Sequence, residues 1–322
     1  MSEPFKILTL DGGGIKGYLS ILILEKIEKA LKRHFKDDKT IGERFDLLVG
    51  TSTGGIIATG LALHKSATEI RELYERLLKK IFSPVYKGYI RPKYNQKVLI
   101  KELENILKDK TFKDVKTHLC LTSVDISTSK PRFFKSPYIE IYHQRADEKL
   151  IDGVLATSAA PVFFPIVDTK HSTYLADGGL VANNPTMVGI IDGYKLTKDL
   201  NKLRVLSIGT GEITYMPYDV EKIKEYGGIF SWALNSKYGI ETILLNKRMI
   251  IPIIEVLLNT QSNLINTQAM HLLGKDKFYR INPPLPTSID LDDVEKIDIL
   301  KNLANIADSE ETINNIINLL TQ

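Results

Sequence analysis

A serine between two glycines is the residue of this chain best placed to act as a nucleophile. Residues 50–54 read Gly-Thr-Ser-Thr-Gly, a G-x-S-x-G pattern centred on Ser52. Apolar runs at 45–49 and 56–63 flank it, which predicts a strand, a sharp turn and a helix. Such a turn exposes the serine hydroxyl above the helix N-terminus. Because the same pattern also fits a purely structural turn, its interpretation depends on the rest of the chain.

A glycine-rich loop near the N-terminus could supply hydrogen-bond donors. Residues 11–17 read Asp-Gly-Gly-Gly-Ile-Lys-Gly and join a predicted strand at 5–10 to an amphipathic helix at 17–36. Consecutive glycines let the backbone turn tightly and bring its N–H groups close to a bound atom. The spacing fits neither the G-x-G-x-x-G dinucleotide motif nor a Walker A loop, since no G-K-[S/T] follows. The loop is therefore predicted to form an oxyanion hole.

A carboxylate in a third glycine-containing turn could act as a base. Asp177 follows the short apolar run 173–175 and precedes Gly178 and Gly179. Asp-Gly is also a common turn pair, so this position taken alone fits an ordinary turn.

Together the three motifs resemble one family, the patatin-like phospholipases, which are acyl hydrolases. The resemblance rests on residues 11–17, 50–55 and 177–179, whose order along the chain matches the family. It extends over roughly residues 5 to 280 and includes weaker matches at 156–161, 163–165, 183–185 and 206–211.

The resemblance implies a catalytic dyad in which Ser52 is the nucleophile and Asp177 its general base. It also implies an oxyanion hole at Gly12, Gly13, Gly14 and Lys16, the last at a position where the family carries Arg or Lys. None of the six histidines lies in a glycine-rich turn, and His171 is the alternative candidate for a serine–histidine pair. A carboxylate can replace imidazole as the base when it is sufficiently desolvated.

Composition agrees with a soluble globular enzyme, and the spacing of possible ligands predicts no metal site. The 322 residues are 43% apolar and 25% charged, and no apolar run approaches the length of a transmembrane helix. The first strand begins at residue 5 and leaves no room for a secretory signal, so a cytoplasmic location is expected. The single cysteine, Cys120, lies in an apolar run and is expected to be a buried core thiol. No spacing of ligands suggests calcium or zinc, so neither a metal nor a cofactor is expected.

Strand and helix patterns alternate along the chain, which predicts an α/β fold with a mostly parallel central sheet covered by helices on both faces. One patatin-like domain is expected over residues 1–285, with an acidic helical extension over 286–322 packed on it. A hairpin is expected over 132–142 with its turn at Ser136-Pro137. The predicted strands are 5–10, 45–49, 118–124, 132–134, 139–142, 173–175 and 204–208, and the predicted helices are 17–36, 53–64, 67–82, 95–108 and 185–200.

Charge is distributed unevenly. The whole chain carries +4, whereas residues 286–322 hold eight acids and two lysines and carry −6, which leaves +10 on the rest. A basic body is attracted to anionic lipid headgroups. The segment 86–94 interleaves three cations with three tyrosines and suits a membrane interface, although an ordinary solvated loop fits as well. The apolar segment 250–258 is either a lid over an acyl pocket or a core helix, and core packing is favoured.

The expected function is that of a phospholipase A-type lipid acyl hydrolase working through an acyl-serine intermediate. The substrate would be a membrane phospholipid or related lipid, reached by peripheral contact with the membrane. In one alternative the protein has the same chemistry but is an anti-phage effector that a cyclic nucleotide switches on, as some bacterial relatives are. The sequence does not identify the small-molecule activator. A lipid-binding scaffold is the non-enzymatic alternative. No nucleic-acid-binding motif is present, so a nucleic acid polymer is not expected as a partner.

Overall fold

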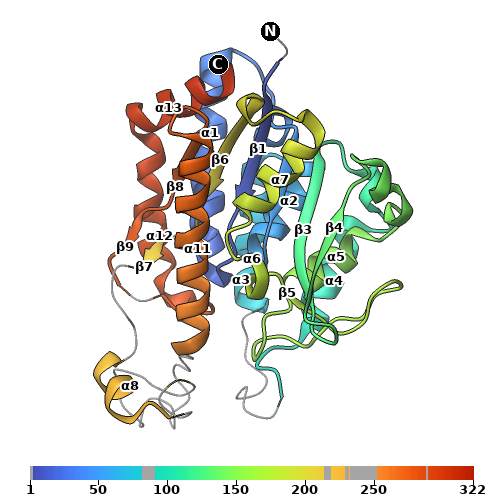
Figure 1. Cartoon of the computed structure of the whole chain (residues 1–322), viewed down its shortest axis with the longest axis vertical. Coiled ribbons are helices and arrows are strands. Elements are labelled where there is room, and N and C mark those ends of the chain that lie inside the picture. The colour runs from blue at the N-terminus through green and yellow to red at the C-terminus, as the bar shows by residue number, and fades with distance from the viewer. Residues whose placement is uncertain (1–2, 82–90, 214–218, 229–231, 233–251, 288) are drawn as a thin grey trace.

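A mostly parallel sheet runs through the centre of the computed structural model, which describes residues 3–81, 91–213, 219–228, 232, 252–287 and 289–322 (Figure 1). Its strand order is β4-β3-β2-β1-β6-β8, with β5 also paired to β3, and only the pairs of β3 with β4 and β5 are antiparallel. The strands are β1 (Phe5–Leu10), β2 (Leu47–Gly50), β3 (His118–Asp125), β4 (Lys130–Lys135), β5 (Leu175–Asp177), β6 (Leu203–Ile208) and β8 (Phe278–Ile281). A separate two-stranded sheet joins β7 (Glu212–Ile213) to β9 (Pro284–Leu285).

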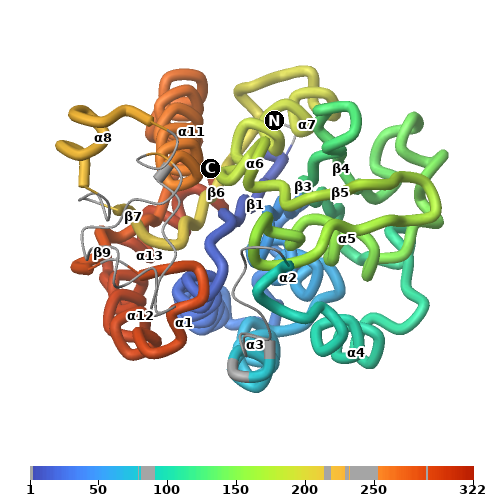
Figure 2. The backbone as a smooth tube through the Cα atoms, turned by 90° about the horizontal axis from the view of Figure 1, so that it is seen from below, coloured from blue at the N-terminus to red at the C-terminus, as the bar shows by residue number. Residues whose placement is uncertain are grey.

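Helices cover both faces of this sheet, as the view along it shows (Figure 2). Alternate residues of each strand face opposite sides. Leu8 and Leu48 accordingly pack under α1, α2 and α3, whereas Ile7 and Val49 pack under α7 and α11. The helices are α1 (Gly17–Phe35), α2 (Thr53–Ala62), α3 (Ala67–Ile81), α4 (Gln96–Leu107), α5 (Leu150–Thr157), α6 (Gly179–Ala182), α7 (Thr186–Thr197), α8 (Val220–Tyr226), α11 (Pro252–Leu273), α12 (Ile297–Leu303) and α13 (Glu310–Thr321).

The predicted hairpin over 132–142 is wrong. Its first half is β4, but β4 pairs back onto β3, and residues 140–145 form a 3-10 helix where a strand was expected. The chain leaves the sheet here because the hydroxyls of Tyr138 and Tyr142 donate to the Asp192 carboxylate in α7, at 2.7 and 3.2 Å.

Helix α5 and strand β8 were not predicted, and the predicted strand 173–175 lies two residues later, at 175–177.

The apolar segment 250–258 belongs to a much longer helix, α11, although residues 250 and 251 lie outside the described part of the chain. The favoured interpretation of this segment as a core helix is wrong. None of residues 253–258 is buried, and Ile253 and Leu257 are exposed. Ile254 and Leu258 instead line the cavity that contains Ser52, so this end of α11 covers a cavity.

The acidic C-terminal segment shares the hydrophobic core of the rest of the chain. Leu300, Ile316 and Leu319 belong to the same buried cluster as Leu8 of β1. Lys26 of α1 also pairs with Asp308 at 2.5 Å. A domain boundary at residue 285 stays a prediction. Over the described residues, no helix combines the length and hydrophobicity needed to cross a membrane.

Candidate active site

Pairing of β1 with β2 brings two of the glycine motifs together. The strands are parallel and in register, with Leu10 opposite Gly50. The N–H of Thr51 donates to the Leu10 carbonyl at 3.1 Å, which keeps the two chains side by side just beyond the strands. The glycine loop after β1 and Ser52 after β2 therefore lie next to each other at the carboxyl edge of the sheet, where ligands of open α/β sheets bind.

Ser52 lies on the predicted sharp turn between β2 and α2. Its backbone has φ 54° and ψ −125°, a conformation that a non-glycine residue adopts only where its surroundings enforce it. The Ser52 N–H donates to the hydroxyl of Thr157 in α5 at 3.0 Å, which helps to hold the turn. This strained geometry directs the side chain away from the backbone at the start of α2.

Asp177 meets Ser52 across 125 residues of sequence. The Ser52 hydroxyl donates to Asp177 Oδ2 at 2.7 Å, and the Gly179 N–H donates to Asp177 Oδ1 at 2.6 Å. The Asp177 side chain is buried, and desolvation raises the pKa of its carboxyl to about 6, against the lowering effect of these two hydrogen bonds. The arrangement joins a serine hydroxyl to a carboxylate whose basicity is increased by burial.

This pKa predicts how hydrolysis depends on pH. If Asp177 is the base, it must be ionised in the free enzyme, so kcat/KM should rise as the pH increases through about 6 and then level off. Measuring kcat/KM on a soluble ester from pH 4 to 9 tests this expectation. An inflection near pH 4, the ordinary value for a solvated carboxyl, would contradict the desolvation of Asp177.

The glycine loop offers two free backbone donors beside Ser52. The Gly12 N–H is already used, because it donates to the Asn183 carbonyl at 3.0 Å. The N–H groups of Gly13 and Gly14 meet no acceptor among the residues that the structure describes, and both glycines line the cavity around Ser52. Lys16 is buried and lies outside the cavity lining. The geometry therefore favours Gly13 and Gly14 as oxyanion donors over Gly12 and Lys16.

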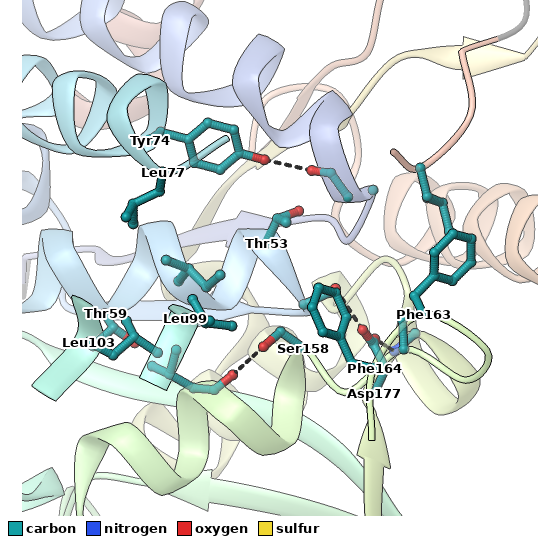
Figure 3. A pocket seen from close by; sticks show the side chains of 18 of the residues that line it. Thr53, Thr59, Tyr74, Leu77, Leu99, Leu103, Ser158, Phe163, Phe164 and Asp177 are labelled. Carbon is teal, nitrogen blue, oxygen red and sulfur yellow. Dashed lines mark hydrogen bonds between the residues drawn. The ribbon is translucent and has the colours of Figure 1, made fainter. Parts of the chain in front are cut away.

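A narrow apolar cavity of about 140 Å³ leads away from Ser52 and Asp177 between α2, α3, α4 and α5. Figure 3 shows Asp177, Phe163 and Phe164 at one end and Thr59, Leu99 and Leu103 at the other. Its walls are almost entirely aliphatic and aromatic, with Ile56, Leu63, Ile70, Leu73, Leu77, Leu78, Ile106, Leu107 and Val154 among them. Such a lining suits a hydrocarbon chain and excludes a polar substrate.

Residues 8–190 match the profile of the family described as patatin-like phospholipase. The chain belongs to the patatin-like phospholipase family. The predicted family, the α/β fold class and the enzyme class, a lipid acyl hydrolase, are thereby confirmed.

Bacterial relatives of this patatin-like chain carry names that include an activator. A cGAMP-activated phospholipase of Vibrio cholerae is 33% identical over 77% of this chain and 76% of its own length. A cGAMP-activated phospholipase of Escherichia coli is 36% identical over 76% of this chain and 73% of its own. A cUMP-AMP-activated phospholipase, also of Escherichia coli, is 30% identical over 64% of each chain.

The alternative serine–histidine pair is not formed. His171 lies 3.9 Å from the Asp147 carboxylate on a surface turn, and none of the cavity-lining residues that the structure describes is a histidine.

Of the predicted membrane segment 86–94, residues 86–90 lie outside the described part of the patatin-like chain. Lys93 is held in an ion pair with Asp292 and is not a free surface cation.

Several residues that shape the site could not be assigned a role from the sequence. Thr157, Phe163 and Asn183 fall within the weaker family motifs, which located them but did not say what they contact. Tyr74 and Leu291 lie in no motif, yet both line the cavity beside the glycine loop. A single sequence contains no signal that would have found these two.

Proposed function

We propose that this chain hydrolyses the ester bonds of phospholipids or related lipids through Ser52 and Asp177. The observation that carries the proposal is the 2.7 Å hydrogen bond between the Ser52 hydroxyl and Asp177, placed at one end of an apolar cavity. A nucleophile bonded to a buried base supports acyl transfer, and the cavity supports an acyl chain as the group transferred.

In the proposed reaction, Ser52 Oγ attacks the ester carbonyl while its proton passes to Asp177 Oδ2. The carbonyl oxygen becomes an oxyanion that accepts hydrogen bonds from the N–H groups of Gly13 and Gly14. Collapse of the tetrahedral intermediate breaks the ester bond, and Asp177 returns the proton to the departing alcohol. Water then attacks the acyl-serine, with Asp177 again as base, and the fatty acid leaves as Ser52 regains its proton.

We propose that the substrate is reached at a membrane surface through apolar side chains around the cavity mouth. Leu180 is exposed and lines the cavity, and the exposed Ile253 and Leu257 each precede an α11 residue that lines it. The net charge of +10 over residues 1–285 adds attraction to anionic headgroups, which salt would screen.

Fatty-acid release from phospholipid vesicles, followed by mass spectrometry, tests the lipid hydrolase. With cGAMP or cUMP-AMP present, the wild-type chain should release fatty acid, whereas a lipid-binding scaffold would bind the vesicles without releasing any. Leu257→Ser should lower turnover on vesicles and leave a short soluble ester unaffected. Leu264→Ser is the matched control, because this leucine is 57% exposed, compared with 58% for Leu257, about two turns further along α11. Equal effects of both substitutions would contradict membrane contact at the mouth.

We further propose that a cyclic nucleotide switches this activity on. The bacterial relatives named as cGAMP- or cUMP-AMP-activated support the proposal, and so does a polar cavity of about 570 Å³ along the edge of β8, between α11 and α13. Amide side chains suit nucleobase edges, and Asn266 Oδ1 is buried with no partner among the described residues. The amides that line the cavity are Asn263, Asn266, Asn282, Asn315, Asn318 and Gln322.

Titration with cGAMP or cUMP-AMP tests this control. One of the two should raise fatty-acid release, and Asn315→Ala should weaken that response by about tenfold or more, the scale of one lost bidentate contact to a base. Asn314→Ala is the control, since this exposed neighbour on α13 lies outside the cavity lining. Full activity without any nucleotide, and no response to either, would show an unregulated enzyme.

A further inference from the structure

The C-terminal segment, far outside the family-matched residues 8–190, reaches back to the glycine loop. The Leu291 carbonyl accepts a hydrogen bond from the Ile15 N–H at 2.8 Å, and Leu291 also lines the cavity. The approach is so close that a Cβ added at Gly14 would overlap the Leu291 carbonyl. Leu291 is therefore part of the wall against which the glycine loop is shaped.

The peptide between Gly14 and Ile15 is held from both sides. Its N–H bonds to Leu291, and its carbonyl, on Gly14, accepts a hydrogen bond from the Tyr74 hydroxyl at 2.6 Å, which Figure 3 shows. Gly14 has φ +57°, a left-handed conformation that glycine adopts readily. Fixing this peptide fixes the direction of the neighbouring Gly13 and Gly14 N–H groups, which are the proposed oxyanion donors.

The residue after Leu291 is bonded to the segment just before α4. Asp292 Oδ2 accepts hydrogen bonds from Lys93 Nζ and from the Tyr94 hydroxyl, each at 2.5 Å. The side chains of Lys93 and Asp292 are only 19% and 12% exposed, so solvent screens their ion pair weakly. Two charge-assisted bonds to one carboxylate make a strong attachment.

Tyr94 continues this attachment toward Asp177. Its N–H donates to the Phe163 carbonyl at 2.9 Å, and its ring packs against Phe163 and Phe164, with centroids 6.4 and 5.6 Å away. The same loop begins at Ala159, whose carbonyl accepts the Asp177 N–H at 3.0 Å. Contacts thus run from Asp292 through Tyr94 to the backbone of the proposed base.

We propose that Asp292 is a positioning residue that holds the glycine loop and the Asp177 segment in one catalytic geometry. The inference rests on the proposed hydrolase function, because it assigns Asp292 a role in that reaction. Asp292 touches neither dyad residue and acts through Leu291 on one side and Tyr94 on the other. Losing its charge leaves Lys93 partly buried without a counter-charge, which displaces the 291–292 segment and, with it, the oxyanion donors.

The test compares Asp292→Asn with Asp298→Asn on a soluble short-chain ester, with the activating cyclic nucleotide present throughout. Asp298 is the matched control, an exposed aspartate of the same segment that pairs with Lys301. Turnover is expressed per reactive serine, counted by end-point labelling with a fluorophosphonate, so that unfolded protein does not enter the rate. Asp292→Asn should lower kcat about 10- to 100-fold with KM changed less than about twofold, since misplacing catalytic groups acts on the transition state. Asp298→Asn should match the wild type.

A second variant keeps the inference testable if Asp292→Asn does not fold. Tyr94→Phe removes only one of the two bonds to Asp292 and should lower kcat per labelled serine several-fold in the same way. The double variant should lose no more than Asp292→Asn alone, because both changes break one connection. Unchanged kcat in either single variant, or a loss confined to vesicle substrates, would overturn the positioning role. A wild type that hydrolyses no ester even with cGAMP or cUMP-AMP added would instead overturn the proposed function, which separates the two failures.

Discussion

Asp177→Asn is expected to abolish hydrolysis while making the folded protein more stable at neutral pH. Asparagine cannot accept the Ser52 proton, and loss of a general base lowers turnover about 10²- to 10⁴-fold. Ser52→Ala should remove activity completely, because this serine alone forms the acyl-enzyme in the proposed reaction. Both losses should appear on soluble and vesicle substrates alike, since they affect the chemistry and not membrane contact.

The gain in stability follows from the sign of the pKa shift. Burial raises the pKa of Asp177 from 3.8 to about 6, so the folded state prefers the protonated carboxyl. Its contribution to stability is fully present below pH 3.8 and is lost as the pH rises through about 6. Asparagine is never ionised, so Asp177→Asn should add up to about 3 kcal/mol to the free energy of unfolding at pH 8 and little at pH 4.

Thermal unfolding of Asp177→Asn and the wild type at pH 4 and pH 8 measures the gain in stability. Ester hydrolysis measures the loss of turnover. His171→Ala is the control, and it should leave activity intact because His171 lies beside Asp147 and away from the cavity. Near-normal turnover in Asp177→Asn would exclude Asp177 as the base. A stability gain of equal size at both pH values would show that the Asp177 carboxyl is not desolvated.

Gly13→Ala is expected to lower kcat about 10²- to 10³-fold, the effect of losing an oxyanion donor. Gly13 has φ 175°, an extended conformation open to any residue, so backbone strain is not the reason. The expected cause is a steric clash, because an added Cβ would lie 2.5 Å from Thr210 Oγ1 and 2.7 Å from Thr210 Cβ. Relieving that contact must displace the loop and its N–H groups.

Gly228→Ala provides the control, since among the described residues a Cβ there would meet nothing closer than 3.8 Å. Thr210→Gly removes the obstructing side chain, so the double variant Gly13→Ala/Thr210→Gly should recover part of the lost kcat. A folded Gly13→Ala protein with full activity would rule out the oxyanion role of this loop. Failure of the double variant to recover any activity would exclude the contact with Thr210 as the cause.

Local patterns predicted the elements whose structure depends on neighbours in sequence. The strand, turn and helix around Ser52 follow from a G-x-S-x-G pattern between two apolar runs. In the structure β2 ends at Gly50 and α2 begins at Thr53, with the turn between them. The glycine loop between β1 and α1 was recognised in the same way. The resemblance then added the pairing of Ser52 with Asp177, which spacing alone could not have singled out among 39 acidic residues.

Elements whose form depends on distant partners were predicted less well. Residues 139–142 have the composition of a strand, but Tyr138 and Tyr142 bond to the buried Asp192 and the chain turns into a 3-10 helix. The apolar segment 250–258 resembled a core helix, yet its position at the cavity mouth leaves Leu257 exposed. Hydrophobicity alone cannot distinguish a side chain packed in the core from one placed over a cavity.

The sequence by itself determined which groups are available for chemistry here: a serine on a sharp turn, a glycine loop and a carboxylate. The tertiary structure decided how these groups work together. The raised pKa of Asp177 comes from desolvation by all the atoms around it. Asn183 already accepts the N–H of Gly12, so within the described part of the chain Gly13 and Gly14 keep their N–H groups free. Contacts such as Leu291 to Ile15 join residues far apart in the chain. Contacts between residues so far apart in sequence depend on how the whole chain packs, and no local sequence pattern predicts them.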